Sequence, residues 1–290
     1  MNLRKSKPRF RKRYLALGIF IAYLIMCQSC MKMRMSPDNT KSFFEQARTV
    51  FSSEQFSSNG HDIHYIQTGD DGKPTLVFVH GSPGSWDAFK EYLKDSMLLK
   101  KYRMIAIDRP GFGYSNFGQA EDLQVQSNLI NAFLKTKDNK QPVILVGHSM
   151  GGPVIVKMAT LVPDQYKALV IVAGSIDPDA EKPENWRRII KVKPIRYLIP
   201  GAMRPANDEL WLLKQDLVDL KPKLKNIRSE VTIIHGTKDQ LVPYSNVDFM
   251  KKEFMNAKNM ELISIKEANH FIPWTHFETI RNALLNLKSE

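Results

Sequence analysis

Cysteine is scarce in this chain of 290 residues, in which only Cys27 and Cys30 occur. Residues 31–290 contain none, so that part of the chain forms no internal disulfide and no thiolate metal site. Clusters of His, Asp and Glu with metal-ligand spacing are also missing, as is a strand followed by the turn G-x-G-x-x-G. The sequence therefore predicts neither a metal nor an organic cofactor.

Acidic residues are missing from positions 1–29, which carry seven Lys and Arg residues. These seven account for most of the formal net charge of +12, and the difference of 12 − 7 leaves +5 for residues 30–290. Because the excess charge is gathered at one end rather than on a basic face, nucleic acid is not a predicted partner. With 43% hydrophobic and 25% charged residues, the chain has a globular composition and enough length for one large α/β domain or two smaller domains.

The apolar run near the N-terminus is shorter than the roughly 20 residues that a spanning helix needs. It covers residues 14–27, between a basic stretch and the residues Gln28, Ser29 and Cys30. This order is typical of a secretory signal, and its end resembles the processing site of bacterial lipoproteins, although Cys27 stands where that signal usually has Leu.

We therefore expect residues 1–30 to be an export signal with Cys30 as the candidate lipidated residue. An uncleaved signal-anchor is the main alternative, and a hydrophobic helix packed on the domain is a third. In the first two cases the basic flank stays in the cytoplasm. The body is then exported and membrane-tethered in the bacterial cell envelope.

The rest of the chain alternates apolar, β-branched strand patterns with helical patterns. Strands are expected at 61–68, 74–81, 102–108, 142–149, 168–175, 230–236 and 260–265, and helices at 85–95, 122–136, 152–162, 208–220, 245–254 and 276–288. This pattern predicts an α/β fold, with a mostly parallel sheet of about eight strands and helices on both faces. Residues 31–54 are expected to form a tether and a short helix (42–51), and residues 55–290 the domain. A Pro-rich, charged stretch at 176–207 is too long for a turn and predicts an insertion above the sheet edge.

A nucleophile motif occupies the carboxyl end of the strand at 142–149. It reads Gly-His-Ser-Met-Gly-Gly (147–152), which is G-x-S-x-G between an apolar strand and a helix. Such a turn lifts the hydroxyl of Ser149 off the sheet, and the helix that follows directs its amides towards developing negative charge. A serine needs a base and an orienting carboxylate, and His270 and Asp239 each follow a later strand.

These motifs resemble those of the α/β-hydrolase family, and the resemblance covers roughly residues 55–288. The chain also has the turn His80-Gly81-Ser82-Pro83-Gly84. With this turn it is similar to the esterase and proline iminopeptidase-like branch of the family. The resemblance implies Ser149 as nucleophile, His270 as general base and acid, and Asp239 as orienting acid. It also implies an oxyanion hole made of the backbone amides of Ser82 and Met150. The insertion falls where this family places its cap, although here the cap is short.

Several residues compete with these assignments. His80, His148 and His235 also lie beside glycines at strand ends, where we expect local hydrogen bonds or core packing. Asp177 and Asp179, which follow the strand at 168–175, are alternatives to Asp239. Related hydrolases sometimes place the acid after the corresponding strand, the sixth of their sheet. The adjacent Asp108 and Arg109 are expected to hold their own loop. The aromatic residues that could line an acyl pocket are assigned no binding role, since such residues are more often core: Trp86, Phe112, Trp186, Trp211 and Trp274.

The sequence thus predicts a serine hydrolase that cleaves a carboxylic ester or related acyl bond of a small molecule through an acyl-enzyme. One alternative is a proline iminopeptidase-like aminopeptidase, in which Glu181 and Glu184 of the insertion would hold a substrate's free amine. Another is a non-catalytic ligand-binding homologue. Acyl transfer to an acceptor other than water would use the same residues. Substrate identity and oligomeric state stay open.

Overall fold

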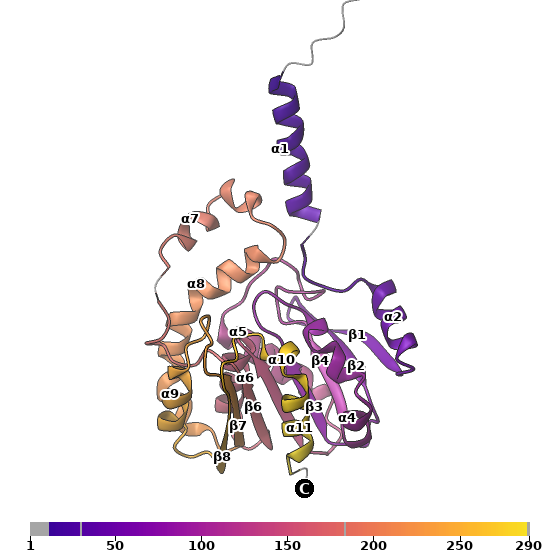
Figure 1. Cartoon of the computed structure of the whole chain (residues 1–290), viewed down its shortest axis with the longest axis vertical. Coiled ribbons are helices and arrows are strands. Elements are labelled where there is room, and N and C mark those ends of the chain that lie inside the picture. Colours follow the sequence, from indigo (N-terminus) through magenta and orange to yellow (C-terminus); the bar gives the residue numbers. More distant parts are fainter. Residues whose placement is uncertain (1–11, 30, 183, 289–290) are drawn as a thin grey trace, which may run out of the picture.

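The computed structural model describes residues 12–29, 31–182 and 184–288, and an eight-stranded sheet forms its centre (Figure 1). The strand order is β1-β2-β4-β3-β5-β6-β7-β8. Strands β3 to β8 pair in parallel, whereas β1 pairs antiparallel with β2 and β2 antiparallel with β4. The bounds are β1 Phe51–Ser58, β2 His61–Thr68, β3 Thr75–Val79, β4 Arg103–Ile107, β5 Val143–His148, β6 Ala168–Val172, β7 Glu230–Gly236 and β8 Asn259–Ile265. The predicted mostly parallel sheet of about eight strands is confirmed.

Helices cover both faces of the sheet because alternate strand residues point to opposite sides. Val77 and Val79 pack into one core with residues of α5 (Leu123–Thr136), α6 (Gly151–Leu161), α8 (Met203–Leu220), the 3₁₀ helix η3 (Lys221–Asn226) and α9 (Ser245–Glu253). Leu76 and Phe78 face a second core on the other side. That core is closed by α2 (Pro37–Gln46), η1 (Trp86–Phe89), α3 (Lys90–Leu93), α4 (Ser96–Lys101), α10 (Ile272–Thr275) and α11 (Phe277–Asn286).

The polar edge strand β1 was not predicted. Its sequence, Phe-Ser-Ser-Glu-Gln-Phe-Ser-Ser, has no apolar alternation, because only a little of it packs against the rest of the protein. The sheet therefore begins before residue 55, the predicted start of the domain. The short helix also lies earlier than predicted, at 37–46 instead of 42–51, and Phe44 from it is buried and stacks on Phe51 and Trp86. Residues 37–54 are thus part of the packed domain rather than a tether alone.

The insertion at 176–207 forms a small cap beyond the carboxyl ends of the strands. It contains α7 (Arg187–Lys191), η2 (Ile195–Leu198) and the first residues of α8 (Figure 1). Helix α1 (Lys12–Ser29) projects from the same side of the molecule, and its last turns contact η2. Of the helices in the described part of the chain, none has the length and apolar character needed to cross a membrane.

A buried ion pair joins the cap helix α8 to the body. Arg109, in the loop after β4, donates from Nη1 and Nη2 to the two carboxylate oxygens of Glu209 at 2.6 and 3.0 Å. Both side chains are fully buried, so each charge depends on the other for its stabilisation. Nη1 of Arg109 also donates to Gln126 on α5. One guanidinium thus holds α5, α8 and its own loop together.

Replacing Glu209 with Ala would leave the Arg109 charge buried without a counter-ion. We expect the free energy of unfolding to fall by about 3–5 kcal/mol, measured by urea denaturation. The matched control is Asp164→Ala, which removes the partner of Arg228 in an exposed pair with an N–O distance of 3.4 Å. That change should cost less than about 1 kcal/mol. Equal effects of the two substitutions would contradict the role assigned to Glu209.

Candidate active site

Ser149 lies in the tight turn between β5 and α6. Its backbone has a φ of +52°, in the left-handed region that a residue with a side chain adopts only under constraint. The constraint is close backbone packing, because a Cβ atom added to Gly147 would collide with the backbone of Gly151. One added to Gly151 would likewise collide with the carbonyl of Val79. Glycine at both positions lets α6 begin directly after the strand, which leaves Ser149 at the surface of a cavity.

The histidine and the acid predicted from the sequence meet at the neighbouring strand ends. Nδ1 of His270, in the loop after β8, lies 2.7 Å from Oδ2 of Asp239, which follows β7. Oδ1 of Asp239 accepts the backbone amides of Leu241 and Val242 at 2.9 and 2.8 Å. The carboxylate is therefore held in place on both oxygens and orients the ring of His270.

The pKa of Asp239 reflects opposing effects. Burial raises it, but the hydrogen bonds from His270 and the Val242 amide, together with the nearby histidine rings, lower it further, and the net pKa lies below the usual aspartate value. Asp239 is therefore ionised at neutral pH, as an acid that orients a histidine must be. Asp177, the rival candidate, instead accepts the backbone amide of Asp179.

Two backbone amides lie unpaired beside Ser149. Among the described residues, no acceptor bonds the amide of Ser82 or that of Met150. The loop that carries Ser82 lies close to Ser149, since a Cβ atom on Gly81 would lie 3.0 Å from the Ser149 Cβ. Unpaired amides close to a nucleophile are the donors that an oxyanion hole requires.

Buried polar groups hold this loop in place. Arg109 donates from Nε to the carbonyl of His80 at 2.8 Å and from Nη2 to that of Gly81 at 3.1 Å. Nε2 of His80 accepts the Arg109 amide at 3.0 Å. Asp108 accepts the amides of Trp86 and Tyr114 at 2.7 and 2.8 Å. The local, structural roles predicted for His80, Asp108 and Arg109 agree with these contacts.

A cavity of about 1460 Å³ contains Ser149 and His270 in its wall. Its apolar lining comes from the cap, from the loops after β7 and β8 and from α10: Met203, Leu210, Trp211, Leu213, Leu241, Val242, Phe271 and Trp274. The volume exceeds the usual range of small-molecule pockets, about 300–1,000 Å³. Of the aromatic residues considered from the sequence, Trp211 and Trp274 line this cavity, Trp86 and Phe112 are buried, and Trp186 is exposed on the cap.

Three buried histidines surround the site and are neutral. Burial, reinforced by the neighbouring His270, lowers the pKa of His148 to about 3, and its Nε2 lies 3.2 Å from the carbonyl oxygen of His270. Burial and the Arg109 charge lower the pKa of His80 well below its usual value, and burial lowers that of His235. His235 also lies beside Asp239, with its Nε2 3.6 Å from Oδ2, but this nitrogen bonds the carbonyl of Val242 at 2.9 Å, and His270 is the nearer ring at 2.7 Å.

The lowered pKa of His148 predicts a loss of stability in acid. Between about pH 3 and about pH 6.5 the unfolded chain binds a proton at this residue and the folded chain does not, so the free energy of unfolding rises with pH. As the pH falls below about 6.5, each such histidine costs about 1.4 kcal/mol per pH unit. His148→Gln should reduce the slope by that amount in urea denaturation between about pH 7 and about pH 5. Above about pH 8, the difference in the free energy of unfolding between wild type and His148→Gln gives the effect of the substitution that does not depend on pH. An equal dependence on pH in the two proteins would contradict a buried, neutral His148 ring.

The structure brings Ser149, Asp239, His270, Ser82 and Met150 to one edge of the sheet, whereas Cys30 lies outside the described residues. Sequence reasoning missed Glu209 and the cavity residues Leu241 and Phe271, and it assigned no binding role to Trp211 and Trp274, which line the cavity. The only sequence feature that could have identified Glu209 is its place among the apolar positions of the helical pattern of α8. Within the described ranges, no group of three or more His, Cys, Asp or Glu residues could hold a metal ion.

Comparisons with known proteins agree with the fold. A family model of the α/β hydrolase fold matches residues 74–197. The uncharacterized hydrolase YugF of Bacillus subtilis is 26% identical over 255 residues, which are 76% of this chain and 91% of YugF. The bifunctional esterase/perhydrolase DCH of Acinetobacter calcoaceticus is 26% identical over 273 residues, which are 79% of this chain and 96% of DCH.

A solved structure extends the likeness to the whole domain. An alpha/beta hydrolase fold protein from Burkholderia ambifaria superposes with a TM-score of 0.66 at 19% identity and covers 81% of this chain and 97% of its own. The chain therefore has the α/β-hydrolase fold, and its similarity to hydrolases of that fold indicates a hydrolase.

Proposed function

We propose that this hydrolase cleaves carboxylic esters through a Ser149-His270-Asp239 triad. The observation that carries the proposal is the arrangement at one cavity wall. Ser149 stands on a strained turn next to the loop of Ser82, and His270 in the same wall is oriented by a buried, ionised carboxylate. A nucleophile, a base and donors for a developing oxyanion are the parts that acyl transfer needs.

In the proposed reaction, His270 removes the proton from Ser149 as its oxygen attacks the ester carbonyl. The amides of Ser82 and Met150 stabilise the negative charge of the tetrahedral intermediate. His270 then protonates the leaving alkoxide, and the C–O bond breaks to leave an acyl-enzyme. A water molecule, deprotonated by His270, attacks the acyl carbon, which releases the acid and restores the Ser149 hydroxyl.

The cavity and the relatives favour an ester over an amide. Its apolar walls can hold an acyl chain beside Ser149, and the named relative DCH is an esterase/perhydrolase. The aminopeptidase alternative would need an ionised, unpaired carboxylate for a substrate ammonium group. Glu184 is instead paired with Arg187, and Glu181 accepts from Ser175 and has its pKa raised by burial. A non-catalytic binding role would leave the oriented His270 without a use.

We also propose that residues 1–30 hold the exported enzyme at a membrane, by lipidation at Cys30 or as an uncleaved anchor. The support is the apolar stretch at 14–27 behind a basic flank, together with helix α1, which exposes large apolar side chains along most of its length. A helix that is apolar on all sides is typical of a lipid environment. Mass spectrometry of the mature protein separates the two forms, because lipidation would leave Cys30 as the first residue.

Replacing Ser149 with Ala should abolish ester hydrolysis. We expect kcat to fall by at least about 10⁴-fold, because the nucleophile is lost, while the circular dichroism spectrum is unchanged. Ser175→Ala is the matched control, since Ser175 lines the same cavity but is bonded to Glu181. It should lower kcat by less than about tenfold. A fluorophosphonate probe should label the wild type and the control but not Ser149→Ala. Full turnover by Ser149→Ala would refute the assignment.

A substrate panel separates the two enzymatic functions. The full chain is assayed with p-nitrophenyl esters of increasing acyl length and with aminoacyl-p-nitroanilides, including that of proline. Because the cavity is large and apolar, we expect hydrolysis of the esters with a preference for medium or long acyl chains over acetate. A preference for the proline anilide would instead assign the aminopeptidase activity, and the next substitution would then be Glu181→Gln.

A further inference from the structure

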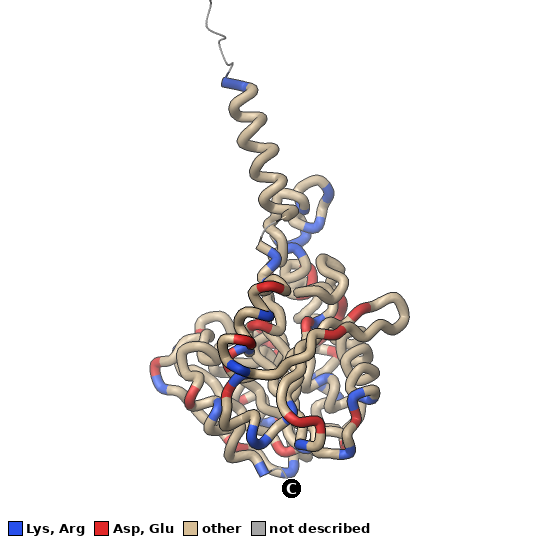
Figure 2. Tube along the Cα trace, turned by 90° about the vertical axis from the view of Figure 1, so that its right-hand side faces the viewer, with Lys and Arg blue, Asp and Glu red and all other residues tan. Residues whose placement is uncertain are grey.

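The cap carries a continuous stretch of one charge sign. Residues 185–207 contain six basic residues and no acidic one: Arg187, Arg188, Lys191, Lys193, Arg196 and Arg204. Arg187 and Arg196 are paired with Glu184 and Asp208. Within the described part of the chain, Arg188, Lys191 and Lys193 form no ion pair with a carboxylate, and all three are exposed. Basic residues therefore gather on the loop beside α1 (Figure 2).

Large apolar side chains are exposed between these cations. Trp186 is 49% exposed, Ile189 59% and Val192 55%, and Ile195 and Tyr197 are exposed as well. We call residues 186–197 the cap face. Several large apolar side chains exposed within twelve residues, mixed with basic ones, are the composition of segments that lie in a lipid interface.

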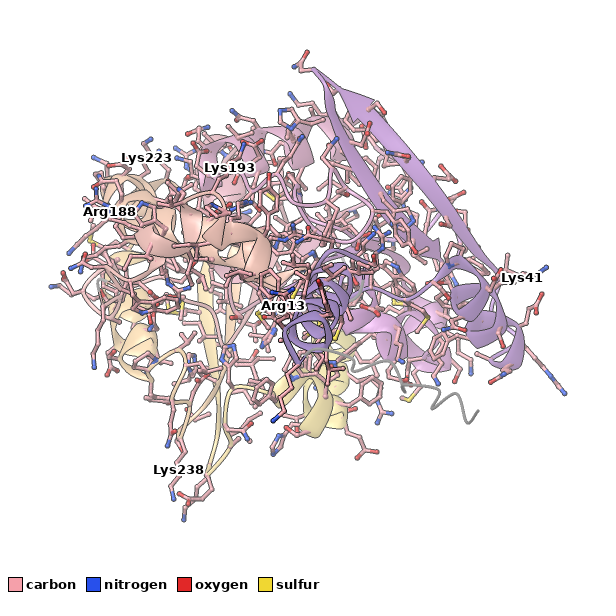
Figure 3. All side chains as sticks on the ribbon, turned by 90° about the horizontal axis from the view of Figure 1, so that it is seen from above. Arg13, Lys41, Arg188, Lys193, Lys223 and Lys238 are labelled. Carbon is pink, nitrogen blue, oxygen red and sulfur yellow. The ribbon has the colours of Figure 1, made fainter. Side chains whose placement is uncertain are left out.

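The cap face lies directly at the foot of α1. The hydroxyl of Tyr23 donates to the carbonyl of Leu198 at 2.8 Å, and the Gln28 side chain donates to the carbonyl of Tyr197 at 2.8 Å. The backbone amide of Gly201 donates to the carbonyl of Cys27 at 2.9 Å. Viewed along α1, Arg188 and Lys193 lie on the cap ribbon to one side of this helix (Figure 3). The last turns of α1 are thus in contact with the end of the cap face.

From this juxtaposition we propose that the cap face binds the surface of an anionic phospholipid membrane, the same membrane that the N-terminal segment enters. Arg188, Lys191 and Lys193, none of which pairs with a carboxylate in the described part of the chain, contact lipid phosphates, while Trp186, Ile189 and Val192 enter the boundary between headgroups and acyl chains. A bilayer is favoured over a protein partner because α1, bonded to the same cap in the form that keeps the anchor, exposes apolar side chains on all sides, as a helix in lipid does.

The same segment also forms part of the cavity wall. Asn185 and Arg187 line the cavity that contains Ser149, while Trp186 between them points outward, and Met33 and Arg34, just after α1, line the cavity too. The membrane-facing cap thus places the cavity beside lipid, and the substrate class is an acyl ester carried by the membrane. This second step rests on the serine hydrolase function proposed above.

The first test measures contact of Trp186 with lipid and needs no catalysis. The full chain is reconstituted into phosphatidylcholine vesicles with or without phosphatidylglycerol, using lipids brominated in the upper part of the acyl chain, which quench nearby tryptophan. The difference between wild type and Trp186→Phe isolates Trp186 from the three other tryptophans. In anionic vesicles we expect at least about a twofold fall in Trp186 emission.

Two charge variants test the electrostatic part. Arg188→Gln/Lys191→Gln/Lys193→Gln removes these cations of the cap face. The matched control removes three exposed lysines from α9 and the loop before β8, at the other end of the molecule (Figure 1): Lys251→Gln/Lys252→Gln/Lys258→Gln. Each cation near anionic lipid strengthens surface binding by roughly fivefold. The cap variant should therefore lose the Trp186 quenching, as should high salt, and the control should keep it.

The second test compares turnover of a vesicle-borne acyl ester with that of a water-soluble p-nitrophenyl ester. The cap variant should lower the first several-fold and leave the second unchanged, and the control variant should change neither. No quenching of Trp186, or equal quenching in the cap variant or in vesicles without phosphatidylglycerol, would overturn the binding of anionic lipid. Equal loss of both activities would overturn the lipid substrate. Absence of all esterase activity in the wild type would overturn the proposed function, while the quenching data would still decide the cap face.

Discussion

The buried guanidinium of Arg109 is the contact on which the rest of this site depends. Its donors reach the carbonyls of His80 and Gly81, the side chain of Gln126 and the carboxylate of Glu209. It therefore fixes the loop that carries the Ser82 amide, and it ties that loop to α5 and to the cap helix α8. A buried charge tolerates few arrangements, because each unpaired donor would carry the full cost of its desolvation. The buried pair of Arg109 and Glu209 thereby fixes the position of the cap helix α8 relative to the cavity.

Steric constraint acts in the same way at the nucleophile. The glycines of the turn allow α6 to start against β3 and β5, and this contact forces Ser149 into its left-handed backbone conformation. Around it, burial keeps the neighbouring histidines neutral, whereas Asp239 stays ionised because two amides and His270 hold its oxygens. The acid beside His270 is thus charged, while the neighbouring histidine rings are not.

The proposed membrane contact extends this organisation outward. Residue 186 faces outward from the protein and residue 187 faces the cavity, so one short segment connects the cap face to the wall above Ser149. In this proposal a lipid surface covers the outer side of the cap. A small cap is then sufficient, because it does not have to enclose the substrate alone. The apolar helix α1 and the basic cap then act on the same membrane.

Much of the fold and the proposed triad could be predicted from sequence because both follow from local patterns. Apolar strand runs, the G-x-S-x-G turn and the order of Ser149, Asp239 and His270 are visible along the chain, and parallel strands place their carboxyl ends at one edge. Strand β1 escaped prediction because an exposed edge strand has no apolar alternation, and the role of Phe44 depends on ring contacts with residues distant in sequence. The pairing of Arg109 with Glu209 and the exposure of Trp186 were decided by the tertiary structure alone, since no local pattern records which buried charges meet or which side of a loop faces water.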